Sequence, residues 1–182
     1  MKKLSWAIMI IAVTSLQANA QKLMTRTGKI SFFSSTPVEN IEAFNNDVSS
    51  VLNTDNGELV FVVPVKSFKF EKSLMQEHFN ESYMESDKYP KADFKGKISN
   101  LSEVNFSKNG TYQAKANGKL TIHGVTKDVS IPGSIVVKDG KVTITSKFKV
   151  KTEDYKIQIP SIAAGKIAKE IEVTVNSILE AK

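Results

Sequence analysis

The feature that most constrains the fold is a period-two alternation of apolar and polar residues along the chain after residue 90. From Val142 to Val150 the apolar residues share one parity, while threonines and lysines occupy the other. Segments 111–122 and 169–180 repeat this arrangement. Because successive side chains of a β-strand point to opposite faces, the alternation predicts strands with one buried and one solvated face.

Short turn signals separate the alternating segments. Residues 54–57, 108–110 and 138–140 contain the Asn, Asp and Gly that tight hairpin turns require. We therefore expect an all-β domain, an eight-stranded antiparallel β-barrel, because closure removes the exposed edges of an open sheet; a sandwich is the alternative. The expected strands span residues 23–34, 47–54, 57–66, 91–99, 111–122, 125–137, 141–150 and 169–180.

One stretch departs from the alternation and predicts a single inserted amphipathic helix over residues 71–83. Its residues at helical spacing are Leu74, Met75, His78, Phe79 and Tyr83. A helix inserted into a barrel lies across an end or against the wall, either as a plug that completes the core or as a lid over a cavity. Residues 37–52 are interrupted by polar Asn and Asp, and we expect irregular structure there, entering the second strand.

The N-terminus has the composition of a cleaved secretory signal peptide. Lys2 and Lys3 precede an apolar run from Leu4 to Leu16, and Ala18 and Ala20 supply small residues before the cleavage point. The run is too short to span roughly 30 Å of hydrocarbon. We therefore expect residues 1–20 to be removed, residues 21–182 to form one domain, and the protein to be periplasmic or secreted.

Composition limits the possible partners of the exported domain. Removal of residues 1–20 leaves 23 basic and 19 acidic residues, a net charge of about +4. The lysines are scattered singly, which is typical of a solvated surface and not of a nucleic-acid-binding face. The chain contains no cysteine, so no disulfide can stabilise it and core burial must suffice.

The chain carries few of the residues that catalysis uses. It has two histidines, no cysteine, no glycine-rich phosphate loop, no Gly-x-Ser-x-Gly elbow and no His-x-x-x-His pair. We therefore expect no enzyme activity, no metal and no cofactor. His78 and His123 are the groups that would carry the alternative, a pocket enzyme acting on a small apolar substrate.

The predicted interior favours a cavity. An eight-stranded barrel is either filled by its own side chains or wide enough for one small ligand. Ala114, Ala116 and Gly118 form a row of small residues that leaves room, although bulky phenylalanines could fill it. The expected ligand-binding residues are Phe32, Phe61, Val63, Phe94, Tyr112, Ala114, Ala116, Leu120, Ile122 and Phe148, and the expected lid or mouth residues are Met75, His78, Phe79 and His123.

Three segments resemble the YceI-like family. They are MQEHF at residues 75–79 with the Tyr-Pro and Ala-Asp-Phe elements that follow, GKLTIHGVTKDV at 118–129, and DYKI at 154–157. The second is similar to the family's Leu-Thr-x-His-Gly-Val-Thr-Lys hairpin almost residue for residue. The resemblance covers about residues 58–180; the N-terminal quarter lacks the family's usual histidines, with Lys29 to Phe33 and Asn45 to Asp47 in their place.

The resemblance implies a lipocalin-like barrel, exported from the cytoplasm, that binds a polyisoprenoid lipid. Combined with the predicted cavity, it favours a carrier of an isoprenoid or similar amphiphilic lipid in the cell envelope, with no nucleic acid as partner. Two other interpretations stay open: an envelope interaction or stress protein with a filled barrel, working through its surface or as a homodimer, and the pocket enzyme.

Overall fold

The computed structural model describes residues 22–181, so the expected signal peptide lies outside the described residues. The strands are β1 (Lys22–Ser35), β2 (Asn40–Asn53), β3 (Glu58–Pro64), β4 (Lys69–Phe70), β5 (Lys91–Ile98), β6 (Gly110–Ile122), β7 (Val125–Lys138), β8 (Lys141–Lys151) and β9 (Glu170–Ala181). The helical elements are η1 (Val65–Ser67), α1 (Ser73–His78), η2 (Phe79–Tyr83), η3 (Leu101–Glu103), η4 (Glu153–Tyr155) and η5 (Ser161–Ala163).

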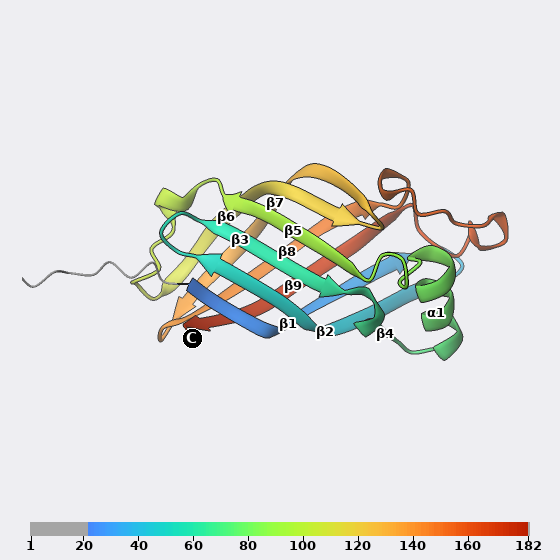
Figure 1. The fold of residues 1–182 in the computed structure, drawn as a ribbon, viewed down its shortest axis with the longest axis horizontal. Coiled ribbons are helices and arrows are strands. Elements are labelled where there is room, and N and C mark those ends of the chain that lie inside the picture. Colours follow the sequence, from blue (N-terminus) through green and yellow to red (C-terminus); the bar gives the residue numbers. More distant parts are fainter. Residues whose placement is uncertain (1–21, 182) are drawn as a thin grey trace, which may run out of the picture.

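The sheet closes on itself (Figure 1). Its strands follow the order β1-β9-β8-β7-β6-β5-β3-β2, and β2 pairs with β1 from Lys22–Asn53 to Ser35–Asn40. Every pairing is antiparallel, and the two-residue β4 adds to one end of β2. The expected eight-stranded barrel is therefore confirmed, and the sandwich alternative is wrong because the β1–β2 ladder leaves no open edge.

The expectation of irregular structure over residues 37–52 is wrong. β2 begins at Asn40 and runs to Asn53, paired with β1 along its length. The polar interruption is a β-bulge, since Ile30 pairs with Asn45 whereas Gly28 pairs with Val48. Asn45 is buried there; its amide donates to the Pro64 carbonyl (2.8 Å), and its side-chain oxygen accepts from the Asp47 N–H (2.9 Å).

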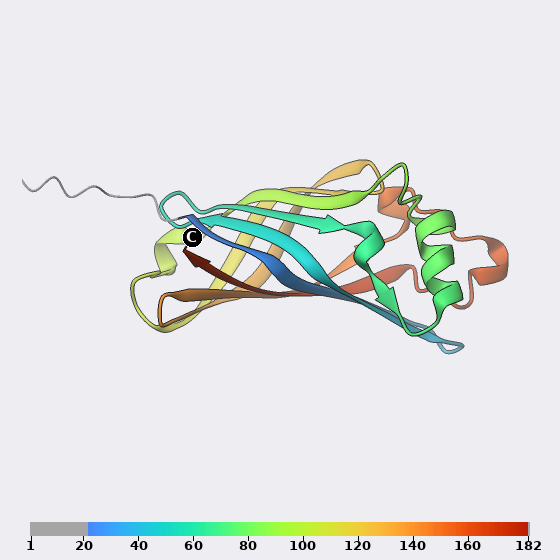
Figure 2. The ribbon, with the colours of Figure 1, turned by 60° about the horizontal axis from the view of Figure 1, so that its bottom comes forward.

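The predicted helix is present but shorter and divided. α1 covers residues 73–78, and a π-helical turn, η2, continues it to Tyr83. Both lie across one end of the barrel, as two views of the ribbon show (Figures 1 and 2). α1 has no buried residue, and Leu74, expected on its apolar face, is 60% exposed. The segment covers the barrel end loosely instead of completing the core.

The opposite end of the barrel is filled. Leu23, Leu52, Val142 and Leu179 are at most 2% exposed, and η3 with the residues around it packs beneath them. The barrel is thus solid at one end and covered by a helix at the other. This asymmetry is a consequence of where the bulky aliphatic residues fall along the strands.

One strand pair is only partly formed. β7 and β8 pair from Gly133–Ser146 to Lys138–Lys141, and no pairing continues toward the helix-covered end. Beyond that point β7 pairs only with β6, and β8 only with β9. We call the unpaired stretch, between residues 125–132 of β7 and 147–151 of β8, the β7–β8 seam.

Candidate functional site

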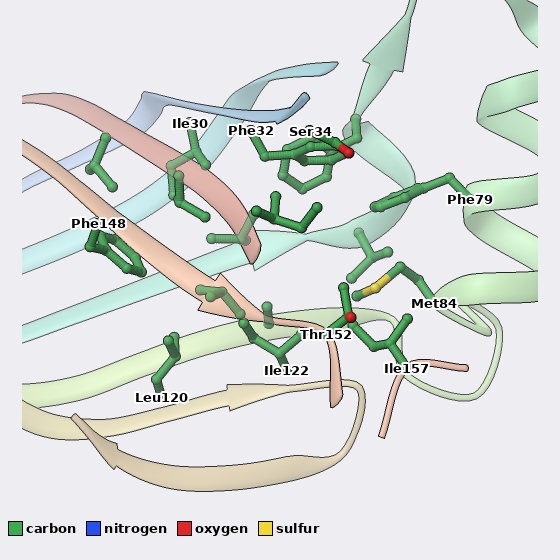
Figure 3. Close-up of a pocket in the computed structure, with 18 of the residues that line it drawn as sticks. Ile30, Phe32, Ser34, Phe79, Met84, Leu120, Ile122, Phe148, Thr152 and Ile157 are labelled. Carbon is green, nitrogen blue, oxygen red and sulfur yellow. The ribbon is translucent and has the colours of Figure 1, made fainter. Parts of the chain in front are cut away.

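A cavity of about 620 Å³ occupies the barrel between the filled end and α1 (Figure 3). Its volume falls within the range of about 300–1,000 Å³ typical of small-molecule sites. Isoleucine, valine, leucine and phenylalanine side chains from all eight long strands form its wall, as expected for inward-facing alternate positions. The site therefore suits an apolar molecule and offers few polar partners to orient one.

Small residues keep the cavity open where β6, β7 and β8 meet. Ala114 pairs with Gly133, which in turn pairs with Ser146, and all three line the cavity beside Ala116. Ala114, Gly133 and Ser146 thus form a row of small side chains across three adjacent strands, at a point where larger residues would meet inside the barrel. The alternation of β6 predicted that Ala114 and Ala116 face inward, but it could not predict their register with β7 and β8.

Gly118, expected to add room, serves the packing of β5 against β6 instead. A Cβ atom at this position would lie 2.4 Å from both the Gly96 Cα and the Lys95 carbonyl oxygen. Gly96 is its register partner, and the Phe94 ring lies over that glycine. The glycine pair lets the two strands approach closely, so its small size does not enlarge the cavity.

Four phenylalanines gather where the helical segment meets the barrel. The Phe79 ring, from η2, lies 5.4 Å from Phe32, 5.6 Å from Phe68 and 5.0 Å from Phe70, measured between ring centroids. Figure 3 shows Phe79 pointing into the cavity from the helical side. We call these four residues the aromatic cluster; they narrow the axial path into the barrel.

Polar groups gather mainly at the rim of the helix-covered end, although Asp93, Ser134 and Ser146 also line the cavity. Lys72, just before α1, lies 3.1 Å from the Glu39 carboxylate of the β1–β2 turn. Lys166 and the exposed His78 also line this rim. Inside it, the buried Ser34 hydroxyl accepts a hydrogen bond from the Ala168 N–H (2.9 Å). The apolar body of an amphiphilic ligand would therefore lie inside the barrel, and its polar end would lie at the rim.

The structure places most of the predicted site residues around this cavity. Every expected ligand-binding residue lines it except Tyr112, and Met75, His78 and Phe79 lie at its helical end. The Tyr112 side chain lies outside the lining, and its hydroxyl donates to the Lys108 carbonyl (2.9 Å). Their role in binding stays a prediction.

His123, expected at the lid or mouth, does not line the cavity. Instead its Nε2 lies 2.8 Å from Glu85, and its Nδ1 lies 3.2 Å from the Tyr155 carbonyl oxygen. Both neighbours are acceptors, so both contacts are hydrogen bonds when each ring nitrogen carries a proton. His123 thus ties the β6–β7 turn to the loop after η2 and to η4.

A second contact joins the same elements. Lys127 of β7 donates to the Asp154 carboxylate of η4 at 2.7 Å, and this hydrogen bond holds the pKa of Asp154 below its ordinary value. Burial raises the pKa of the adjacent Tyr155. The β6–β7 turn is therefore held to the chain that follows β8 by side chains, where a backbone ladder is missing.

Sequence reasoning missed the residues that follow β8. Ile157, Ile159, Ile162 and Ile167 line the cavity, and all belong to the β8–β9 connection (residues 152–169). Ile162 is 90% exposed, although it borders the same space. Isolated isoleucines in a stretch otherwise rich in polar and small residues were the available signal; without strand or helix periodicity they cannot be assigned to a face.

Little in the site supports chemistry. Among residues 22–181, no group of three or more histidine and carboxylate side chains is placed to hold a metal ion. No helix in that range is long and apolar enough to cross a bilayer. What the arrangement can do is remove an apolar chain from water.

A closed antiparallel barrel around an apolar cavity defines the class of lipocalin-like barrels. A family profile described as the YceI-like domain matches residues 13–179. The chain therefore belongs to the YceI-like family, as the motifs predicted. The match also includes the N-terminal quarter, in which the family's usual histidines are missing.

Solved structures share the fold at low sequence identity. A polyisoprenoid-binding domain from Saccharophagus degradans, implicated in plant cell wall breakdown, has a TM-score of 0.77 at 14% identity, over 90% of this chain and 100% of that one. BcnA from Burkholderia cenocepacia has a TM-score of 0.69 at 17% identity, over 85% and 96%. The YceI protein from Campylobacter jejuni has a TM-score of 0.57 at 18% identity, over 100% and 94%. A search of curated proteins gives no match.

Proposed function

We propose that this protein binds a long apolar chain, an isoprenoid or a similar amphiphilic lipid, inside the barrel and carries it in the cell envelope. The observation that carries the proposal is the cavity of about 620 Å³ with an apolar wall and a polar rim at one end. The polyisoprenoid-binding domain from Saccharophagus degradans, which shares the fold, supports the class of ligand. The composition of residues 1–20 supports export.

The energetics of burial suit such a ligand. Each methylene moved from water into the cavity contributes about 0.8 kcal/mol, so ten of them contribute about 8 kcal/mol before the cost of association. A Kd near 1 μM corresponds to about 8 kcal/mol. Because association itself costs about 4 kcal/mol or more, a chain with about fifteen or more buried carbons is needed to reach the micromolar range without any specific polar contact.

The same cavity argues against the two alternatives from sequence. A filled barrel would leave no space of this size between β6, β7 and β8. For the pocket enzyme, His123 is occupied with Glu85 and Tyr155, and His78 is exposed at the rim without a hydrogen bond or ion pair to any residue of the range 22–181. His123 therefore lies outside the cavity lining with both ring nitrogens engaged, and no described side chain orients His78 as a general base.

The proposal is tested by blocking the cavity with Ala116→Phe. Ala116 lines the cavity between its register partners, Ile98 of β5 and Ile131 of β7, so a phenyl ring there occupies the space of the ligand. We expect binding of a fluorescent farnesyl or longer prenyl chain to weaken at least tenfold, and native mass spectrometry of protein from its exported compartment to show no bound lipid.

The matched control is Lys115→Phe. Lys115 is the neighbouring, exposed residue of β6 on the opposite face, so the same ring points into solvent. Circular dichroism and urea unfolding establish that both variants remain folded. Ligand capture by Ala116→Phe equal to that by Lys115→Phe would place binding outside this cavity and contradict the proposal.

A further inference from the structure

The β7–β8 seam has a specific chemical cause. The hydroxyl of Ser146 donates to the Pro132 carbonyl oxygen, which shows that this edge of Pro132 faces β8. In a strand the N–H and C=O of a residue point to the same side, and proline has no N–H to donate. The ladder between β7 and β8, followed from the β7–β8 turn, therefore stops at Gly133–Ser146 and does not reach Pro132.

The cavity reaches the seam from inside. Ile131 and Pro132 on the β7 edge, and Phe148 and Val150 on the β8 side, all line it. Burial changes at the same point: inward-facing Ile135 and Val137 in the paired half of β7 are 2% and 3% exposed, whereas Val129 and Ile131 beside the seam are only half-buried. The inward-facing side chains of β7 are thus least buried where its backbone is unpaired with β8.

Side chains close the outer end of the seam. The Lys127–Asp154 pair, at 2.7 Å, joins β7 to η4, and His123 joins the β6–β7 turn to the Tyr155 carbonyl. We call the Lys127–Asp154 pair the latch. Both of its side chains are 43% exposed, so the latch is open to solvent and to salt.

The two routes into the cavity differ in what must move. The axial route passes the aromatic cluster, whose rings lie 5.0 to 5.7 Å apart, and the Lys72–Glu39 pair. Separating β5 from β6, or β8 from β9, breaks a backbone ladder, and where the β2–β3 ladder stops, β4 adds to β2. Opening the seam breaks side-chain contacts (the latch, the His123–Tyr155 contact and the Ser146–Pro132 hydrogen bond) but no described backbone ladder. A flexible apolar chain then enters along its whole length instead of being threaded by one end.

We propose that the β7–β8 seam is a lateral gate through which the apolar chain enters and leaves the cavity, closed by the latch. The inference rests on the proposed function and adds the route of loading. The residues that set the rate of exchange are then Lys127, Asp154 and Pro132, which lie apart from the helical lid.

Cysteine cross-linking tests this route, and the chain has no native cysteine to interfere. Lys127→Cys with Asp154→Cys, joined by a short cleavable bis-thiol reagent, locks the seam. Stopped-flow fluorescence with a dansyl-labelled farnesyl chain measures uptake and release. We expect both rates to fall at least tenfold at unchanged Kd, and to recover when the linker is cleaved.

Two further cross-links make the result specific. Val136→Cys with Thr143→Cys joins register partners in the paired part of the ladder, and we expect it to leave both rates unchanged. Lys72→Cys with Glu39→Cys locks the axial end. If that lock slows exchange and the latch lock does not, the gate is axial and the inference is wrong. If the probe binds no uncross-linked protein at equilibrium, the proposed function itself fails.

A charge exchange gives a second test without a linker. Lys127→Glu places two carboxylates opposite each other and should speed release severalfold, with the increase abolished by adding Asp154→Lys. Unchanged release in the single variant would contradict the latch. Recovery in the double variant separates the latch from a general effect of mutating β7.

Discussion

Two serines occupy the interior where aliphatic residues would be expected. Ser50 of β2 and Ser177 of β9 are 1% and 0% exposed, and their hydroxyl oxygens lie 2.9 Å apart. Gly28 of β1 lies against them, since a Cβ there would come within 2.5 Å of the Ser177 Oγ. At this point three strands leave room for two small polar groups that satisfy each other.

We predict that Ser177→Ala lowers the free energy of unfolding by about 1–3 kcal/mol, because it leaves the Ser50 hydroxyl buried without its partner. The double variant with Ser50→Ala removes both polar groups and should recover part of that loss. Urea unfolding at constant m-value measures both. A double variant as unstable as the sum of two single losses would show that the pair is not coupled.

Residue positions were predicted well where only the face of a strand mattered. Alternation placed Ala114, Ala116, Leu120 and Ile122 on the inner face, and they line the cavity. It could not give the partners of His123, because Glu85 and Tyr155 lie 38 and 32 residues away along the chain. Contacts between turns of different hairpins depend on barrel register, which one strand's pattern does not contain.

At the scale of the elements, β8 has two differently paired halves. From Val142 to Ser146 it pairs with both β7 and β9, whereas from Lys147 to Lys151 it pairs with β9 alone. Successive amides of a strand point to opposite neighbours, so alternate amides of the second half have no ladder partner.

We predict that amide hydrogen exchange, followed by NMR, shows protection at every residue of 142–146 and at alternate residues only of 147–151. Slow exchange requires a hydrogen bond that opens rarely, and the seam supplies none from β7. β9, which is paired on both sides along residues 172–176, serves as the internal control. Uniform protection along all of β8 would mean that the seam is closed in solution.

Element boundaries were least predictable where polar residues enter a strand. Asn45 interrupts the apolar pattern of β2, yet it satisfies both ends of its amide with backbone groups inside a bulge. The helical segment was located correctly, but its π-helical turn was not, since spacing of apolar residues alone does not distinguish a π turn from an α turn. Local propensity is outweighed in both cases by contacts with the rest of the barrel.

At the scale of the whole molecule, ligand binding and stability are linked. A ligand that binds only the folded state, present at about one hundred times its Kd, adds about 2.7 kcal/mol to the free energy of unfolding. For a domain of this size we predict a rise in Tm of about 5–10 °C with a farnesyl or longer prenyl chain. Differential scanning calorimetry measures it. An equal rise in Ala116→Phe would assign the effect to surface association.

The fold could be predicted from the sequence because alternation and turn signals act locally along each strand. The volume of the cavity could not, since it depends on Ala114, Gly133 and Ser146 lying in one row across three strands. Nor could the partial β7–β8 ladder, although Pro132 was visible as the residue that a central strand excludes. The size of the cavity and the access to it both depend on the register between neighbouring strands, which the pattern of a single strand does not contain.

Pro132 divides the wall between β7 and β8 into a paired and an unpaired part. On one side of it β7 is hydrogen-bonded to both β6 and β8, which makes that part of the wall rigid; on the other side β7 and β8 share no ladder, and the wall there can yield. The filled end of the barrel limits the length of a bound chain, whereas the unpaired wall can move outward to accept a wider one. We therefore expect this barrel to discriminate between chains by carbon number more sharply than by branching.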